Sequence, residues 1–130
     1  MSFGVSPSDF INIPQFAWRV YQSCKHAPGD FKAAASEVQG VYIILTEIND
    51  SRAHLPLSPT QERRLASLGA GCLDALKELE DLLARFRSLG TNAPGKGERL
   101  AWGTQEVQNI RRQLIDHTSL LTSFNSSITK

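Results

Sequence analysis

The chain has 130 residues, of which 41% are hydrophobic and 21% are charged. A chain of this length forms one domain and can bury a core without disulfides or metals. Its formal net charge is only +1, which excludes the strongly basic surface typical of nucleic-acid-binding domains. The longest unbroken apolar run covers residues 41–45, far fewer than the ~20 residues that span a bilayer. The composition predicts a single soluble domain, residues 1–130, in the cytoplasm.

The first predicted helix begins near Ser6 or Ser8 and ends near Lys25. Its opening letters SPSD have the form of a capping box with proline at the first helical position. One face then carries apolar residues at alternating spacings of three and four: Phe10, Ile13, Ala17, Val20 and Cys24. Pro14 lies inside this pattern, so we expect a kink, or a separate short first turn that ends near Asn12.

A second helix is predicted to open after residues 27–29 and to run to about Ser51. Its apolar stripe consists of Phe31, Ala34, Val38, Val41, Leu45 and Ile48, with Tyr42 and Ile44 widening it. Residues 28–51 hold one basic side chain (Lys32) against four acidic ones, a net charge of −3. The simplest interpretation of this charge is a solvated acidic helix face.

The third helix begins at a second capping box, in which Ser58 is the cap and Gln61 reaches back to it. A heptad of apolar residues follows and favours packing of the coiled-coil type; it comprises Leu65, Leu68, Cys72, Ala75, Leu79, Leu82, Phe86 and Leu89. Gly69 and Gly71 lie in the first half of this helix. Since each glycine costs about 1 kcal/mol relative to alanine, we expect a bend there or the close approach of another helix.

A loop rich in glycine and proline, residues 90–97, separates this helix from a last one that begins at Thr104. The last helix repeats the heptad spacing with Val107, Ile110, Leu114, His117, Leu121, Phe124 and Ile128. Four amphipathic helices in succession predict an all-α fold, an antiparallel four-helix bundle with alternating helix directions. An extra short helix is an option at the start of the chain or at residues 98–102. Because the last helix keeps its apolar pattern almost to the final residue, we expect this domain to be the N-terminal part of a longer protein.

The residues that could carry chemistry are few and scattered. Cys24 and Cys72 are the only cysteines, and their positions on apolar stripes predict two buried free thiols, with a single disulfide between them as the alternative. The three histidines lie on different elements without metal-ligand spacing, and His117 is best explained as a core histidine with a hydrogen-bonded ring. Residues 90–97 miss the phosphate-binding loop pattern, because Gly97 occupies the place of its serine or threonine. We therefore predict no catalytic, cofactor-binding or metal site, and no small-molecule substrate.

The first helix is unusually apolar. Eight large apolar residues fall between Phe3 and Val20, a stretch with one acidic and one basic group. A helix that is apolar all round is buried or partnered, and burial in its own bundle is one interpretation. The alternative is contact with a membrane interface or a partner; the candidate contact residues are Val5, Phe10, Ile11, Ile13, Phe16, Trp18 and Val20.

Several short stretches resemble the HeLo-like N-terminal domain of fungal NLR-type (STAND) proteins, and together they cover nearly the whole chain. They are MSFGVS (1–6), DFI (9–11), AWRVYQSCK (17–25), APGDF (27–31), LSP (57–59), LEDLL (79–83), RLAWG (99–103) and LIDHT (114–118). Domains of this kind resemble the helical bundles that execute regulated cell death. The resemblance implies self-association into a homo-oligomer, with movement to the plasma membrane on activation. It also implies that the segment from Val5 to Val20 permeabilises the membrane.

Three other functions remain open at this point. The bundle could be a homotypic or adaptor interaction module without membrane activity, or a passive regulatory cap on a larger enzyme. An enzyme in its own right is the third, although the residues offer no acid–base pair and no activated nucleophile to support one.

Overall fold

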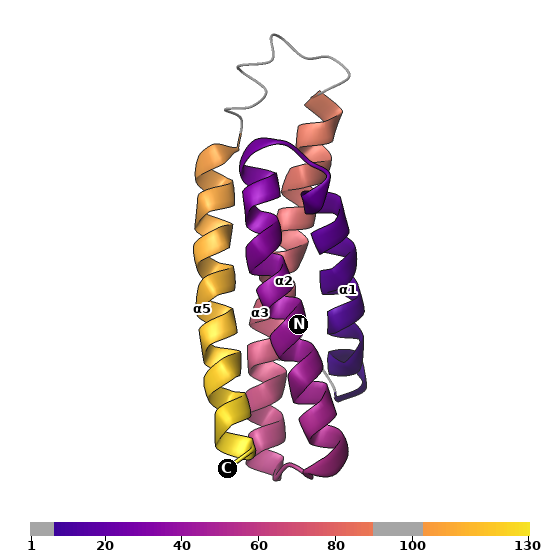
Figure 1. Ribbon diagram of the computed structural model, residues 1–130, viewed down its shortest axis with the longest axis vertical. Coiled ribbons are helices and arrows are strands. Elements are labelled where there is room, and N and C mark those ends of the chain that lie inside the picture. The colour runs from indigo at the N-terminus through magenta and orange to yellow at the C-terminus, as the bar shows by residue number, and fades with distance from the viewer. Residues whose placement is uncertain (1–6, 90–102) are drawn as a thin grey trace.

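The computed structural model describes residues 7–89 and 103–130. Within these ranges the chain forms four α-helices and no strands, so the predicted all-α four-helix bundle is confirmed (Figure 1). The helices are α1 (Pro7–Lys25), α2 (Gly29–His54), α3 (Pro59–Leu89) and α5 (Thr104–Ile128). The extra short helix expected at residues 98–102, the glycine-rich loop and Val5 lie outside the described residues.

Most helix ends agree with the sequence signals. Ser58 and Gln61 form the predicted capping box, because the Gln61 amide donates to Ser58 Oγ at 3.2 Å and the Ser58 amide donates to Gln61 Oε1 at 2.8 Å. The prediction for α2 stopped too early, since this helix continues past Ser51 to His54. Its end is set by Leu55, which takes an extended conformation, as expected for a residue that precedes a proline.

Pro14 does not divide the first helix. The helix α1 runs continuously from Pro7 to Lys25 with Pro14 inside it, so the expectation of a separate first turn ending near Asn12 is wrong. The Pro14 side chain is buried. Proline removes one backbone hydrogen bond of the helix, and burial of apolar surface by the surrounding stripe favours continuation of the helix despite that loss.

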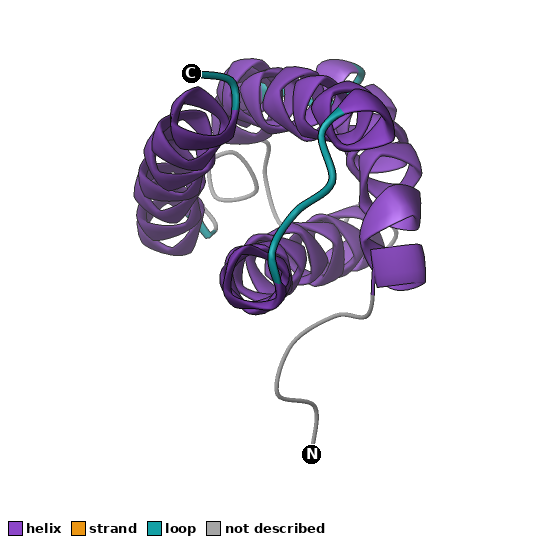
Figure 2. Cartoon of the chain, turned by 90° about the horizontal axis from the view of Figure 1, so that it is seen from below, coloured by secondary structure: helices purple, strands orange, loops and turns teal. Residues whose placement is uncertain are grey.

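Consecutive helices run in opposite directions, but consecutive helices are not always neighbours. Around the bundle the order is α1, α2, α5 and α3, so α2 and α3 lie on a diagonal. The link between them, residues 55–58, crosses the end of the bundle in Figure 2. As a result α2 lies parallel to α5 and α1 lies parallel to α3. Paired side chains show this register: Asp30 with Gln108 and Ser51 with Asn125 between α2 and α5, and Arg19 with Glu80 between α1 and α3.

The core is apolar throughout the described residues, which bury no charged or polar residue. All four stripes predicted from the sequence supply it, and Leu45, Leu79 and Leu114 are among the fully buried side chains. Full burial of a side chain of this kind contributes roughly 1.5–3 kcal/mol. Polar contacts lie around this core; the ion pair between Arg111 and Glu37, for example, ties α5 to α2 at the half-buried margin.

Candidate functional site

The predicted contact residues of the first helix separate onto two faces. Phe10, Ile13 and Val20 lie in the core, with exposed fractions of 1%, 3% and 0%. Ile11 and Trp18 point outward and are 56% and 44% exposed. Phe16 is half-buried and packs against the edge of the core. The docked bundle therefore presents only part of the predicted set to a membrane or a partner.

Ile11 and Trp18 share one helix face because they are seven residues, about two turns, apart. Trp18 is the centre of an aromatic cluster on the surface. Its ring centroid lies 5.2 Å from that of Tyr21 on the same helix and 5.2 Å from that of Tyr42 on α2. Such distances are typical of favourable ring contacts, so the cluster fixes an indole ring at the junction of α1 and α2.

A groove follows this junction, and we call it the α1/α2 groove. One part is a cavity of about 310 Å³ lined by Ile11, Pro14, Gln15, Trp18, Tyr42, Thr46, Asn49 and Asp50. A second part, of about 520 Å³, continues from Ile11 toward the crossing link and is lined also by Asn49, Arg52, Ala53, Pro56, Leu57 and Glu62. The two exposed apolar residues of α1 thus line a concave surface that α1 and α2 form together.

Asn49 lines both parts of the groove, and its side-chain oxygen is exceptional. Asn49 Oδ1 is buried and has no hydrogen-bond partner in the structure. A buried acceptor without a donor costs roughly 1–3 kcal/mol, so such groups are rare and point to a missing partner. Nearby, Arg52 is already engaged: it pairs with Glu62 at 3.3 Å and lies over the ring of Phe10 at 5.6 Å.

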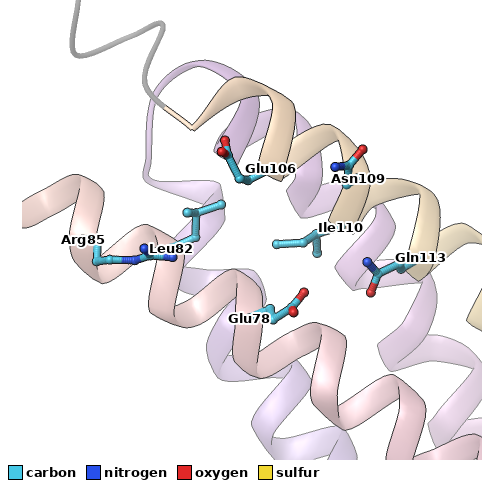
Figure 3. A pocket seen from close by; sticks show the side chains of 7 residues that line it. All are labelled: Glu78, Leu82, Arg85, Glu106, Asn109, Ile110 and Gln113. Carbon is cyan, nitrogen blue, oxygen red and sulfur yellow. The ribbon is translucent and has the colours of Figure 1, made fainter.

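The opposite side of the bundle carries a different pocket, between α3 and α5 (Figure 3). Its volume is about 300 Å³, and its lining consists of Glu78, Leu82, Arg85, Glu106, Asn109, Ile110 and Gln113. Figure 3 shows charged side chains of both signs around Leu82 and Ile110. The described lining contains no serine, cysteine or histidine, and its two carboxylates, Glu78 and Glu106, share the pocket with Arg85.

The two thiols are buried, as predicted, and neither forms a disulfide. Burial raises the pKa of Cys24 to about 12, against a smaller lowering effect of Arg87, and burial likewise raises the pKa of Cys72 to about 12. Only a thiolate is strongly nucleophilic. Both side chains therefore act as small apolar residues of the core.

The sequence predicts that His117 lies in the core, but its side chain is only half-buried on α5. Its ring lies over Gly71 of α3, which is the close approach that the glycine predicted. Burial lowers the pKa of His117, while Asp116 and Asp74 oppose this effect. In the described part of the chain no three His, Cys, Asp or Glu side chains are grouped so that they could hold a metal ion.

Comparison with protein-family models, with curated proteins and with solved structures finds no match to this chain. None of the helices in the described ranges has the length and apolar character needed to cross a membrane. The fold and the site define an all-α bundle whose main surface feature is the α1/α2 groove. Sequence reasoning found Ile11 and Trp18 but missed Asn49 and Asp50, because no local pattern marks the residues that face another helix across a groove.

Proposed function

We propose that the chain is a HeLo-like signalling and execution domain of fungal regulated cell death, acting in heterokaryon incompatibility or immunity. It oligomerises in the cytoplasm, moves to the plasma membrane and permeabilises it through the N-terminal helix. The supporting observation is that α1 is apolar on two sides. One side is buried through Phe10, Ile13 and Val20, and the other exposes Ile11 and Trp18. Such a helix suits an apolar environment in both the docked and the released state.

Two polar contacts between α1 and α3 are weak, which is consistent with a releasable helix. The ion pair of Arg19 with Glu80 is long, at 3.6 Å, and its side chains are 67% and 40% exposed, so it contributes little. Arg87 donates to the carbonyl of Ser23 at 3.3 Å on the surface. Apolar burial is the main attachment, at roughly 1.5–3 kcal/mol for each large side chain. Lipid or a neighbouring copy must replace that burial when α1 leaves.

Release of dye from lipid vesicles tests this function. The chain is fused to a chemically inducible dimeriser and mixed with anionic and with neutral vesicles. We expect leakage only after clustering. The double substitution Ile11→Glu and Trp18→Glu abolishes it, because both side chains point outward and the bundle stays folded while its apolar surface is lost. Deleting α1 is a poor test, since the deletion also removes Phe10, Ile13 and Val20 from the core.

The structure offers a closely matched control on the far side of the bundle. Ile115 and Leu120 on α5 are 54% and 44% exposed, almost the same values as for Ile11 and Trp18. The control pair Ile115→Glu and Leu120→Glu is expected to retain leakage. Equal loss in both pairs, or no leakage from clustered protein with either lipid, would contradict membrane execution through α1.

An interaction module without membrane activity is the second candidate, and the α1/α2 groove favours it. A concave surface with a fixed aromatic ring and an unpaired buried acceptor is typical of a protein-binding site. On this proposal the same double substitution removes partner binding or self-association, measured by light scattering, and vesicles remain intact with every variant. In both cases we propose that the domain acts without catalysis.

A further inference from the structure

Several groups that line the groove beside Trp18 are of kinds that attract positive charge. Two aromatic rings, Trp18 and Tyr42, line the same part of the groove as the carboxylate of Asp50 and the side chain of Asn49. The hydroxyl of Thr46 donates its proton to the carbonyl of Tyr42 at 2.8 Å, so the oxygen itself is left as an acceptor. Aromatic faces, carboxylates and acceptor oxygens all attract positive charge.

Within the described chain, no positively charged side chain pairs with these groups. The described residues that line this part of the groove include no lysine, arginine or histidine. Within the described ranges neither Asp50 nor Glu47, one helical turn before it, forms an ion pair. The nearest arginine along the groove, Arg52, is held by Glu62. The acidic character expected for residues 28–51 thus remains uncompensated at the α1/α2 groove, whereas Asp30 and Glu37 are bonded to α5.

Asp50 gives the groove a carboxylate that can bind a cationic group. Asp50 lines the part of the groove beside Trp18 and is exposed. An ammonium or guanidinium group placed there would contact the Asp50 carboxylate. The alkyl stem of a lysine or arginine can meanwhile pack on apolar side chains, and Ile11 and Pro14 provide that surface.

We propose that the α1/α2 groove binds a lysine or arginine side chain of a protein partner. The cationic group lies between the ring of Trp18 and the carboxylate of Asp50, and flanking apolar residues of the partner cover Ile11. This binding site goes beyond the proposed membrane activity and does not depend on it. Vesicle leakage can fail while the groove still binds a basic peptide, and the reverse outcome is equally possible.

A library of random short peptides displayed on phage tests the proposal with the intact chain as bait. We expect the selected peptides to share a basic residue next to an apolar one. A synthetic copy of the strongest binder is then titrated by fluorescence anisotropy against the chain and its variants. Replacing its basic residue by norleucine, which keeps the stem and removes the charge, should weaken binding about tenfold or more. Binding should also weaken as salt is added.

Substitutions in the groove separate the contributions of the ring and the charge. Trp18→Leu keeps an apolar side chain but removes the π face, and we expect a loss of about tenfold. Asp50→Asn removes only the charge, and a loss of about threefold is expected for a partly exposed carboxylate. Asp81→Asn, an exposed carboxylate on α3, and Ile115→Ser are the matched controls, and neither should change the affinity.

Five results would overturn the proposal. The first is a library that shows no enrichment over uncoated wells, and the second is a set of selected peptides without basic residues. The third is a set of selected peptides whose affinity is unchanged by Trp18→Leu and by Asp50→Asn. The fourth is displacement of the peptide by phosphatidylcholine vesicles, which would assign the groove to a choline headgroup. A dimer of the chain that dissociates with Trp18→Leu but not with Ile115→Ser would assign it to a second copy instead.

Discussion

The ring of His117 on α5 lies directly over Gly71 on α3. A Cβ atom at position 71 would lie 2.9 Å from His117 Cε1, closer than non-bonded carbon atoms approach. Because Gly71 on α3 has no side chain, the ring of His117 on α5 has room between the two helices. The contact lies where α3 and α5 run antiparallel, one to two helical turns from the pocket of Figure 3, whose lining includes Glu78 and Gln113.

The first prediction concerns this contact. Alanine at position 71 gains about 1 kcal/mol of helix propensity relative to glycine, but in the native chain its methyl group displaces the His117 ring. We expect Gly71→Ala to stabilise the chain by about 1 kcal/mol in a His117→Ala background and to give no such gain with the ring present. Urea unfolding of the two single variants and the double variant measures the coupling. An identical effect of Gly71→Ala in both backgrounds would mean that the ring moves aside freely.

The second prediction is a loss of stability at mildly acidic pH. Burial lowers the pKa of His117 below its ordinary value of 6.5, so the unfolded chain binds this proton more tightly than the native one. The stability that the neutral ring contributes is complete above the unfolded pKa and is lost as the pH falls through the native pKa. We expect His117→Gln to flatten the pH dependence of the free energy of unfolding between neutral pH and pH values below 6.5. A steeper decline in the variant than in the native chain would show the opposite sign.

The helix pattern was predictable because it depends on local signals. The capping box of Ser58 and Gln61, and the proline after Leu55, act within a few residues. Apolar periodicity likewise assigned the buried face of each helix. The diagonal position of α2 and α3 was not predictable, since periodicity shows which face is buried but not which helix covers it. That arrangement depends on how four stripes fill one core.

The candidate site was only partly predictable for a related reason. Phe10 and Ile11 are adjacent in sequence, yet one is buried and the other is 56% exposed. A count of apolar residues groups them together, although a step of one residue turns the side chain by about 100° around the helix. Asn49 gave no signal at all, because the burial of its oxygen depends on tertiary packing and not on the local sequence. Sequence patterns marked the outer face of α1 and left the α2 side of the groove unmarked.

The third prediction tests the capping box of α3. Replacing an N-cap serine by alanine typically costs about 1 kcal/mol, and Ser58 Oγ accepts the Gln61 amide. We expect Ser58→Ala to destabilise the chain by about that amount, and the double variant with Gln61→Ala to lose less than the sum of the two single losses. Ser67→Ala, an exposed position within the same helix, is the control and should be neutral or slightly stabilising. Equal effects at positions 58 and 67 would contradict a capping role.

The last prediction uses the two thiols to detect movement of α1. Cys24 lies on α1 and Cys72 on α3, both are fully buried, and burial raises the pKa of each thiol to about 12. In the resting bundle we expect both to react slowly with iodoacetamide, because little thiolate forms and the reagent is excluded. In urea both should react quickly, since exposure returns each pKa toward its ordinary value of 9.0.

Clustered protein on vesicles distinguishes release of α1 from general unfolding. If α1 leaves the bundle while α2, α3 and α5 stay packed, the thiol of Cys24 is exposed and becomes alkylated well before that of Cys72, as mass spectrometry of the digested chain would measure. The faster alkylation of Cys24 should persist in the Ile115→Glu control. It should disappear in the variant that carries both Ile11→Glu and Trp18→Glu, which is not expected to bind lipid. Simultaneous alkylation of both thiols would instead indicate that the whole core opens, because Cys72 lies fully buried on α3 and not on the helix that is proposed to leave.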